Sequence, residues 1–103
     1  MEHMTELDDA IGELWNTFAP TARARVDVLE NYLGRLKDGT AETASRMAAA
    51  SSAHKLAGAL GSFQRPGSDQ AAALEELLRE TDPVDAADAE PLVVFLRAVV
   101  TPP

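Results

Sequence analysis

Residues 51–63 read SSAHKLAGALGSF, and their spacing is that of an amphipathic helix. Apolar residues recur there at steps of three and four, which predicts one core-facing stripe made up of Ala49, Ala53, Leu56, Leu60 and Phe63. His54 lies about 200° from Leu56 around the helix axis, at roughly 100° per residue. We therefore expect a packed helix that presents a single histidine to solvent.

The side of this helix that carries His54 holds mostly small residues. Its members are Met47, Ala50, Ser51, Ala57, Gly58 and Gly61. A glycine costs about 1 kcal/mol relative to alanine in a helix interior, so two of them need a physical reason. The glycines either clear a path for another molecule to reach the imidazole or let a neighbouring helix pack closely. The spacing favours neither explanation.

Residues 53–58 (AHKLAG), residues 60–63 (LGSF) and residues 72–75 (AALE) together resemble the histidine-containing phosphotransfer domain of multistep two-component signalling. The resemblance is sharpest across residues 51–78. It implies a small helical bundle in which His54 accepts a phosphoryl group from the aspartate of a response-regulator receiver domain and passes it to another receiver. A hybrid histidine kinase is a further implied partner. Docking would use the face formed by Met47, Ala50, Ser51 and Ala57, beside Gly58 and Gly61.

Two positions depart from the family pattern. The family usually has a lysine three positions after the histidine, where it helps to hold the phosphoryl group, and this chain has Ala57. Lys55, about 100° around the axis, and Arg65, about 20° away if the helix continues that far, are the candidate substitute cations. Ten positions after the histidine the family commonly has glycine. Gln64 stands there, and it is expected to reshape the helix end or to supply an amide near the site.

The resemblance also implies a polar neighbour for the imidazole on the next helix, which packs antiparallel in that family. Glu75 is the first candidate and Gln70 the second; plain surface charge is the alternative for Glu75. In this interpretation Nε2 attacks phosphorus while Nδ1–H donates to that neighbour. Mg²⁺ is expected only in the partner receiver domain, so no cofactor and no turnover of its own are expected for this chain.

Composition limits the alternatives. The 103 residues carry a net charge of −8, are 46% hydrophobic and 5% aromatic, and include no cysteine. This predicts one alanine-rich helical domain with no disulfide, which repels nucleic acid and anionic membranes. No apolar run approaches the ~20 residues that span a bilayer, so we expect a cytoplasmic protein, which the resemblance implies is bacterial.

The predicted fold is all-α, an antiparallel four-helix bundle with an additional N-terminal helix. The expected helices cover residues 5–19, 20–37, 40–64, 68–80 and 91–100, and Pro20 is expected to separate the first two. In the last helix the predicted stripe is Leu92, Phe95, Leu96 and Val99. We assign residues 5–100 to the domain, residues 1–4 to a cloning remnant or disordered start, and residues 101–103 to a tail or the start of a linker.

Other functions fit less well. A metal site at His54 has no second His, Asp or Glu three or four residues away. An ATP-dependent kinase is disfavoured because Lys55 follows the histidine and no ATP-binding glycine motif occurs. The remaining alternative is a helical interaction or dimerisation module in which His54 is incidental. For the phosphotransfer protein, a monomer or one part of a larger signalling chain is expected.

Overall fold

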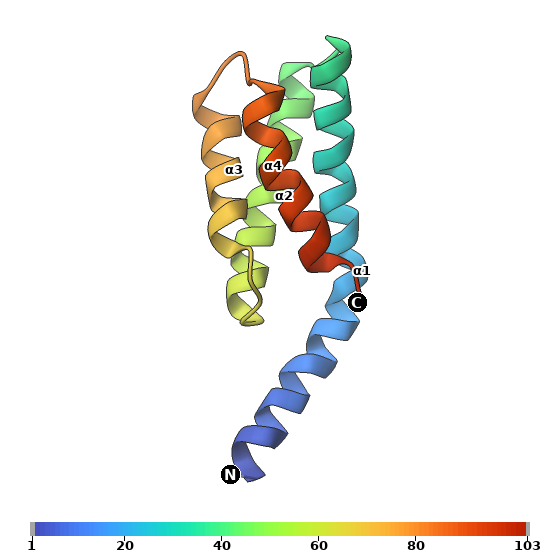
Figure 1. The fold of residues 1–103 in the computed structure, drawn as a ribbon, viewed down its shortest axis with the longest axis vertical. Coiled ribbons are helices and arrows are strands. Elements are labelled where there is room, and N and C mark those ends of the chain that lie inside the picture. Colours follow the sequence, from blue (N-terminus) through green and yellow to red (C-terminus); the bar gives the residue numbers. More distant parts are fainter. Residues whose placement is uncertain (1, 103) are drawn as a thin grey trace.

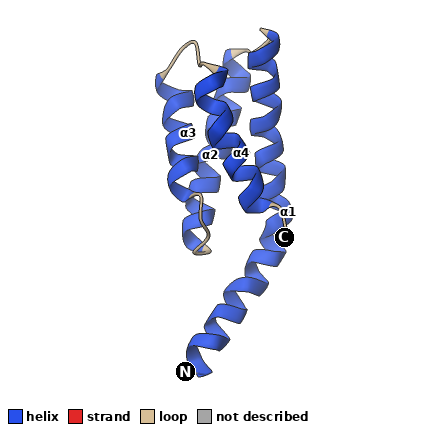
Figure 2. Ribbon diagram, in the orientation of Figure 1, coloured by secondary structure: helices blue, strands red, loops and turns tan. Residues whose placement is uncertain are grey.

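A computed structural model describes the backbone of residues 2–102 and the side chains of residue 7 and residues 9–102. Its helices are α1 (Glu2–Asp38), α2 (Thr43–Ser62), α3 (Ser68–Glu80) and α4 (Ala86–Val100), arranged as in Figure 1. Within the described backbone there is no strand (Figure 2). Met1 and Pro103, at the ends of the predicted start and tail, lie outside the described residues. The all-α prediction is confirmed.

The four helices form a closed ring of neighbours. Across residues 2–102 the backbones of α1 and α2, α2 and α3, α3 and α4, and α4 and α1 approach each other, whereas the diagonal pairs meet only through their side chains. Consecutive helices run in opposite directions (Figure 1). As a result, α2 and α4 expose their outer faces on opposite sides of the bundle.

The core lies along the stripe predicted on α2. Ala49, Ala53, Leu56 and Leu60 are fully buried, and Phe63 packs against the core at its edge. They meet large buried side chains from the other three helices, namely Val26, Leu29, Leu74, Leu78 and Leu96. Burying each such leucine contributes about 1.5–3 kcal/mol, so this stripe holds α2 in place. That prediction is confirmed.

The predicted break at Pro20 is wrong, because α1 continues through it. The additional N-terminal helix is therefore the first part of α1, and the described bundle has four helices in place of five. Pro20 has no N–H to donate to the carbonyl of Asn16, but its ring is exposed while Ala19 and Ala22 beside it are buried. The start of α1 leans away from the bundle (Figure 1), whereas Trp15 and Ala19 further along the helix are buried in the core.

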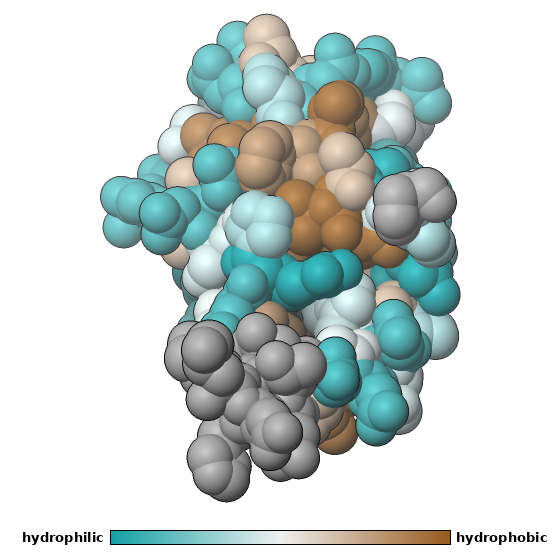
Figure 3. Space-filling model, turned by 60° about the horizontal axis from the view of Figure 1, so that its bottom comes forward, coloured by the Kyte–Doolittle hydropathy of each residue, from teal (hydrophilic) through white to brown (hydrophobic). Residues whose placement is uncertain are grey.

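In α4 the buried stripe differs from the predicted one. The buried residues are Ala89, Val93, Leu96 and Val100, while Phe95 is 41% exposed. Residues 92–96 are all apolar, so their pattern contains no polar side that sets the phase of the helix. The helix also begins earlier than predicted, where the Asp85 carboxylate accepts from the backbone N–H of Ala87 at 2.9 Å. Figure 3 shows apolar side chains gathered on one face of the bundle.

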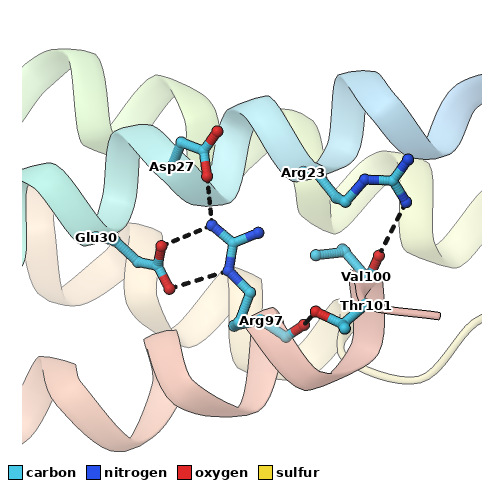
Figure 4. A network of polar contacts seen from close by, with 6 residues as sticks. All are labelled: Arg23, Asp27, Glu30, Arg97, Val100 and Thr101. Atoms are coloured by element: carbon cyan, nitrogen blue, oxygen red, sulfur yellow. Dashed lines mark hydrogen bonds and ion pairs between the residues drawn. The ribbon is translucent and has the colours of Figure 1, made fainter. Parts of the chain in front are cut away.

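An ion-pair cluster joins α4 to α1, and Figure 4 shows it. Arg97 donates from Nε and from a terminal nitrogen to the two carboxylate oxygens of Glu30, at 3.0 and 2.6 Å, and also pairs with Asp27. These hydrogen bonds from Arg97 hold the pKa of Glu30 below its usual value. We call Asp27, Glu30 and Arg97 the anchor cluster, because they fix which side of α4 meets α1.

Two helices end in the same hydrogen-bond pattern. At the end of α1, Gly39 N–H donates to the Leu36 carbonyl and Thr40 N–H to the Arg35 carbonyl. At the end of α2, the N–H groups of residues 64 and 65 donate to the carbonyls of residues 61 and 60. Both are Schellman motifs, which place one residue in the left-handed region. Gly39 has φ 73° there, whereas Gln64 has φ 56° with a full side chain.

Candidate functional site

His54 lies on the outer face of α2 with its side chain 70% exposed. Its Nδ1 lies 3.0 Å from Oε1 of Glu75 on α3. Because an ionised carboxylate only accepts hydrogen bonds, this contact requires the proton on Nδ1. The lone pair of Nε2 is then free to react, and the high exposure of the ring leaves it accessible.

Glu75 is held from a second side. Its other oxygen, Oε2, accepts from Nε of Arg79 at 2.8 Å, one helical turn further along α3. The hydrogen bond from Arg79 and then that from His54 hold the pKa of Glu75 below its usual value, so the carboxylate stays ionised. We call His54, Glu75 and Arg79 the site cluster.

The pairing of α2 with α3 places Glu75 beside His54. Arg46 on α2 donates to the Leu78 carbonyl at 2.7 Å, and Ser68 on α3 donates from Oγ to the Ala57 carbonyl at 2.8 Å. These two bonds lie on either side of the His54–Glu75 contact along the antiparallel pair. They fix the register of the two helices, and the buried alanines between them allow close approach.

The two glycines have different surroundings. A Cβ at Gly58 would meet nothing within 4 Å, whereas a Cβ at Gly61 would meet Ser68 Oγ at 3.5 Å. Close helix packing therefore does not explain Gly58, which leaves open space one turn after His54. At Gly61 the neighbour is at ordinary van der Waals distance.

The residues of the predicted docking face differ in their exposure. Met47 is 43% exposed, and Ser51 and Ala57 are half-buried. Ala50 is fully buried, so its prediction as a docking residue is wrong. The buried arc of α2 is wider than one stripe because both α1 and α3 pack against it, and Ala50 falls within that arc.

The candidate substitute cations lie in different places. Lys55 is exposed on α2 next to His54. Arg65 is not on the helix, because α2 ends at Ser62, and its guanidinium lies 4.4 Å from the ring centroid of Trp15. The assumption that the helix continues to Arg65 is wrong. The residue stacks on an aromatic ring and does not make the phosphate contact for which it was a candidate.

The structure places the two polar candidates of α3 on different faces. Glu75 contacts the imidazole, whereas Gln70 is half-buried about 140° around the helix from it. Gln64 lies in the turn after α2 in left-handed backbone, so the helix end keeps the geometry that favours glycine.

Arg79 was not predicted from the sequence. The signal that could have found it is the spacing of Glu75 and Arg79, which stand four residues apart on one helix. The pair can be assigned to the site only when Glu75 is known to face His54. Among the described residues no group of three or more metal-ligating side chains comes together, and no helix there is long and apolar enough to cross a membrane.

The described residues form an all-helical bundle that presents the oriented, exposed imidazole of His54. The family model described as "Hpt domain" matches residues 13–100, and the chain belongs to this family. The resemblance found in the sequence is thereby confirmed, and the family supports a general phosphotransfer role in phosphorelay signalling, with receiver and kinase components as partners. No curated protein and no solved structure gave a match to the chain.

Proposed function

We propose that His54 accepts a phosphoryl group from the phosphorylated aspartate of one receiver domain and passes it to the aspartate of another. The observation that carries this proposal is the 3.0 Å contact between Nδ1 of His54 and Oε1 of Glu75 on a side chain that is 70% exposed. It orients the ring and leaves Nε2 available to an incoming receiver.

In the proposed transfer, one bond to phosphorus forms as another breaks. The lone pair of Nε2 attacks phosphorus and forms an N–P bond, while the P–O bond to the aspartyl oxygen breaks and its electron pair leaves with the carboxylate. The imidazole gains positive charge and keeps its proton on Nδ1. The ionised Glu75 lies against that proton and stabilises the charge. Transfer to the second receiver reverses the same bonds.

The receiver would approach over Gly58, with Ala57 beside it and Gly61 about one turn further along, and Ser51 and Met47 about two and three turns before it. The open space at Gly58 supports this approach. Lys55 lies beside the histidine and would face the acidic pocket of a receiver. In this proposal Mg²⁺ belongs to the receiver, and the chain works in the bacterial cytoplasm as a monomer or as part of a larger signalling chain that includes a hybrid kinase.

The test is to incubate the protein with a phosphorylated receiver domain and to assay it for acid-labile, base-stable phosphate. Wild type should be labelled. His54→Gln should not be labelled, and it should keep the helical circular dichroism and the melting temperature because the side chain is exposed. A folded wild type that takes no label from any receiver would instead favour the helical interaction module.

A further inference from the structure

Arg79 is bonded to the same carboxylate that contacts His54. Its Nε donates to Oε2 of Glu75 at 2.8 Å, while Nδ1 of His54 lies 3.0 Å from Oε1. Because the two donors use separate oxygens, Arg79 and His54 do not compete for Glu75. The carboxylate therefore contacts a donor on each of its two oxygens.

Other arginines of the bundle are engaged elsewhere. Arg65 lies over Trp15, Arg46 donates to the Leu78 carbonyl, and Arg97 belongs to the anchor cluster. In the part of the chain that the structure describes, Arg79 is the cation bonded to the residue that holds the imidazole. Its side chain is 40% exposed, so its positive charge can interact with a charged group that binds at the surface.

We propose that Arg79 is a positioning residue, which acts through Glu75 to keep the His54 proton on Nδ1 and to present Nε2 to the receiver. This inference rests on the proposed function. A glutamate side chain has several rotatable bonds, and one hydrogen bond to an exposed imidazole would hold it weakly. The second bond, from Arg79, restricts the carboxylate to the geometry that His54 needs.

Arg79 has a second effect once the phosphoryl group is present. A phosphoryl group on Nε2 brings negative charge to a ring whose other nitrogen already faces the carboxylate of Glu75. Like charges at this separation repel each other, and the guanidinium of Arg79 offsets the charge of Glu75. The pair thus stabilises the positive ring without adding a net negative charge next to the phosphoryl oxygens.

The first test needs no phosphorylation. The ¹⁵N signals of the neutral His54 ring, assigned with His54→Gln, show which nitrogen carries the proton. Wild type should show the Nδ1–H form, and Arg79→Ala should shift the ring toward the Nε2–H form common for a free histidine side chain. Arg79→Lys should restore part of the Nδ1–H signal. Arg35→Ala, which removes an exposed arginine of α1, is the matched control and should resemble wild type.

The second test measures transfer from a phosphorylated receiver. Arg79→Ala should be labelled about two- to threefold more slowly than wild type, and high salt should reduce that difference because the pair is half-exposed. In a Glu75→Gln background, Arg79→Ala should have no further effect. An unchanged ring spectrum in Arg79→Ala, or an undiminished rate effect without Glu75, would overturn the inference. Absence of label on wild type would overturn the proposed function, whereas the ring spectrum still decides the role of Arg79 in holding the imidazole.

Discussion

The site cluster and the anchor cluster are built from the same kinds of groups and differ in what they leave available. In the anchor cluster, Arg97 reaches from α4 to Glu30 and Asp27 on α1, and the cross-helix bonds join charged groups on both sides. In the site cluster, Arg79 pairs with Glu75 on its own helix. The bond that crosses between helices is the one to His54, whose second ring nitrogen stays open.

This difference separates a structural ion pair from the proposed reactive site. Nε and one terminal nitrogen of Arg97 donate to carboxylates of α1, so the anchor cluster ties two helices together. In the site cluster the carboxylate orients the imidazole of His54, the proposed nucleophile, which is more exposed than any member of the anchor cluster. Variants of the site cluster should therefore change the rate of transfer, and variants of the anchor cluster should change the free energy of unfolding.

Blocking the open nitrogen should have the largest effect after removal of His54 itself. Gly58→Leu fills the empty space one turn after the histidine, and it should slow transfer about a hundredfold, since a misplacement of about 1 Å can cost that much. Stability should rise by about 0.5–1 kcal/mol because an exposed helical glycine is replaced. Transfer kinetics and thermal unfolding measure the two effects.

The matched control is Gly34→Leu, because a Cβ at Gly34 on α1 also meets nothing within 4 Å. This variant should gain similar stability and transfer at the wild-type rate. Equal transfer by Gly58→Leu and Gly34→Leu would show that the receiver does not approach over Gly58.

Removing the charge of Glu75 should weaken the site cluster without loosening the fold. Glu75→Gln keeps the shape of the side chain but removes the negative charge that faces the positive ring. We expect transfer to slow about tenfold, which is less than the effect usual for a residue that acts as a general acid or base. The melting temperature should change little. Rapid-quench labelling measures the rate, and a wild-type rate would show that the contact with His54 has no part in transfer.

Breaking the anchor cluster should do the opposite. Arg97→Ala should lower the free energy of unfolding by about 1 kcal/mol, as expected for exposed ion pairs in a network, and the melting temperature by about 4–8 °C. Transfer to His54 should be unaffected, since α4 lies on the opposite side of the bundle from α2. Thermal unfolding and labelling of the same sample check both statements.

Acid should abolish the difference in stability between wild type and Arg97→Ala. The pKa of Glu30 is held below its ordinary value of 4.5 by the hydrogen bond from Arg97, so its stabilising effect is complete above that value. It is lost as the pH falls through the lowered pKa. Wild type and Arg97→Ala should therefore converge in stability below this range, and a penalty that persists there would mean that Arg97 stabilises by packing alone.

The smallest expected effect touches neither cluster. Gln64→Gly places glycine where the backbone has φ 56°, which removes a strain of about 1 kcal/mol and is partly offset by the larger freedom of glycine in the unfolded chain. A net gain of about 0.5 kcal/mol should appear in denaturant unfolding. The reverse change at the end of α1, Gly39→Gln, should destabilise by a similar amount. No change in either variant would show that the left-handed positions are unstrained.

Periodicity predicted the core side of α2 because polar and small residues alternate clearly with the apolar stripe there. It failed for α4, where residues 92–96 are uniformly apolar and the buried side depends on long-range packing against α1 and α3, which no local pattern contains. The expectation that a proline breaks a helix failed at Pro20, since buried alanines on both sides keep α1 helical across the missing hydrogen bond.

For the candidate site, the exposure of His54 and the position of Glu75 could be predicted, the first from helical phase and the second from the family resemblance. The burial of Ala50 could not, because it depends on how closely α3 approaches. Arg65 required knowledge of where α2 ends, and Arg79 required the orientation of Glu75. The role of a side chain that acts through a neighbour can be inferred only when the neighbour's contacts are known.

The leaning start of α1 has a consequence for how the molecule tumbles. The principal extents are 53 × 21 × 20 Å, and the radius of gyration of 14.8 Å exceeds the roughly 13 Å of a compact chain of this length. Rotation about the long axis is therefore faster than end-over-end rotation. Backbone N–H bonds in the bundle lie close to that axis, so their spin relaxation reflects the slower motion. Amides in the leaning segment point in another direction, and their relaxation rates encode the angle at which it leaves the bundle.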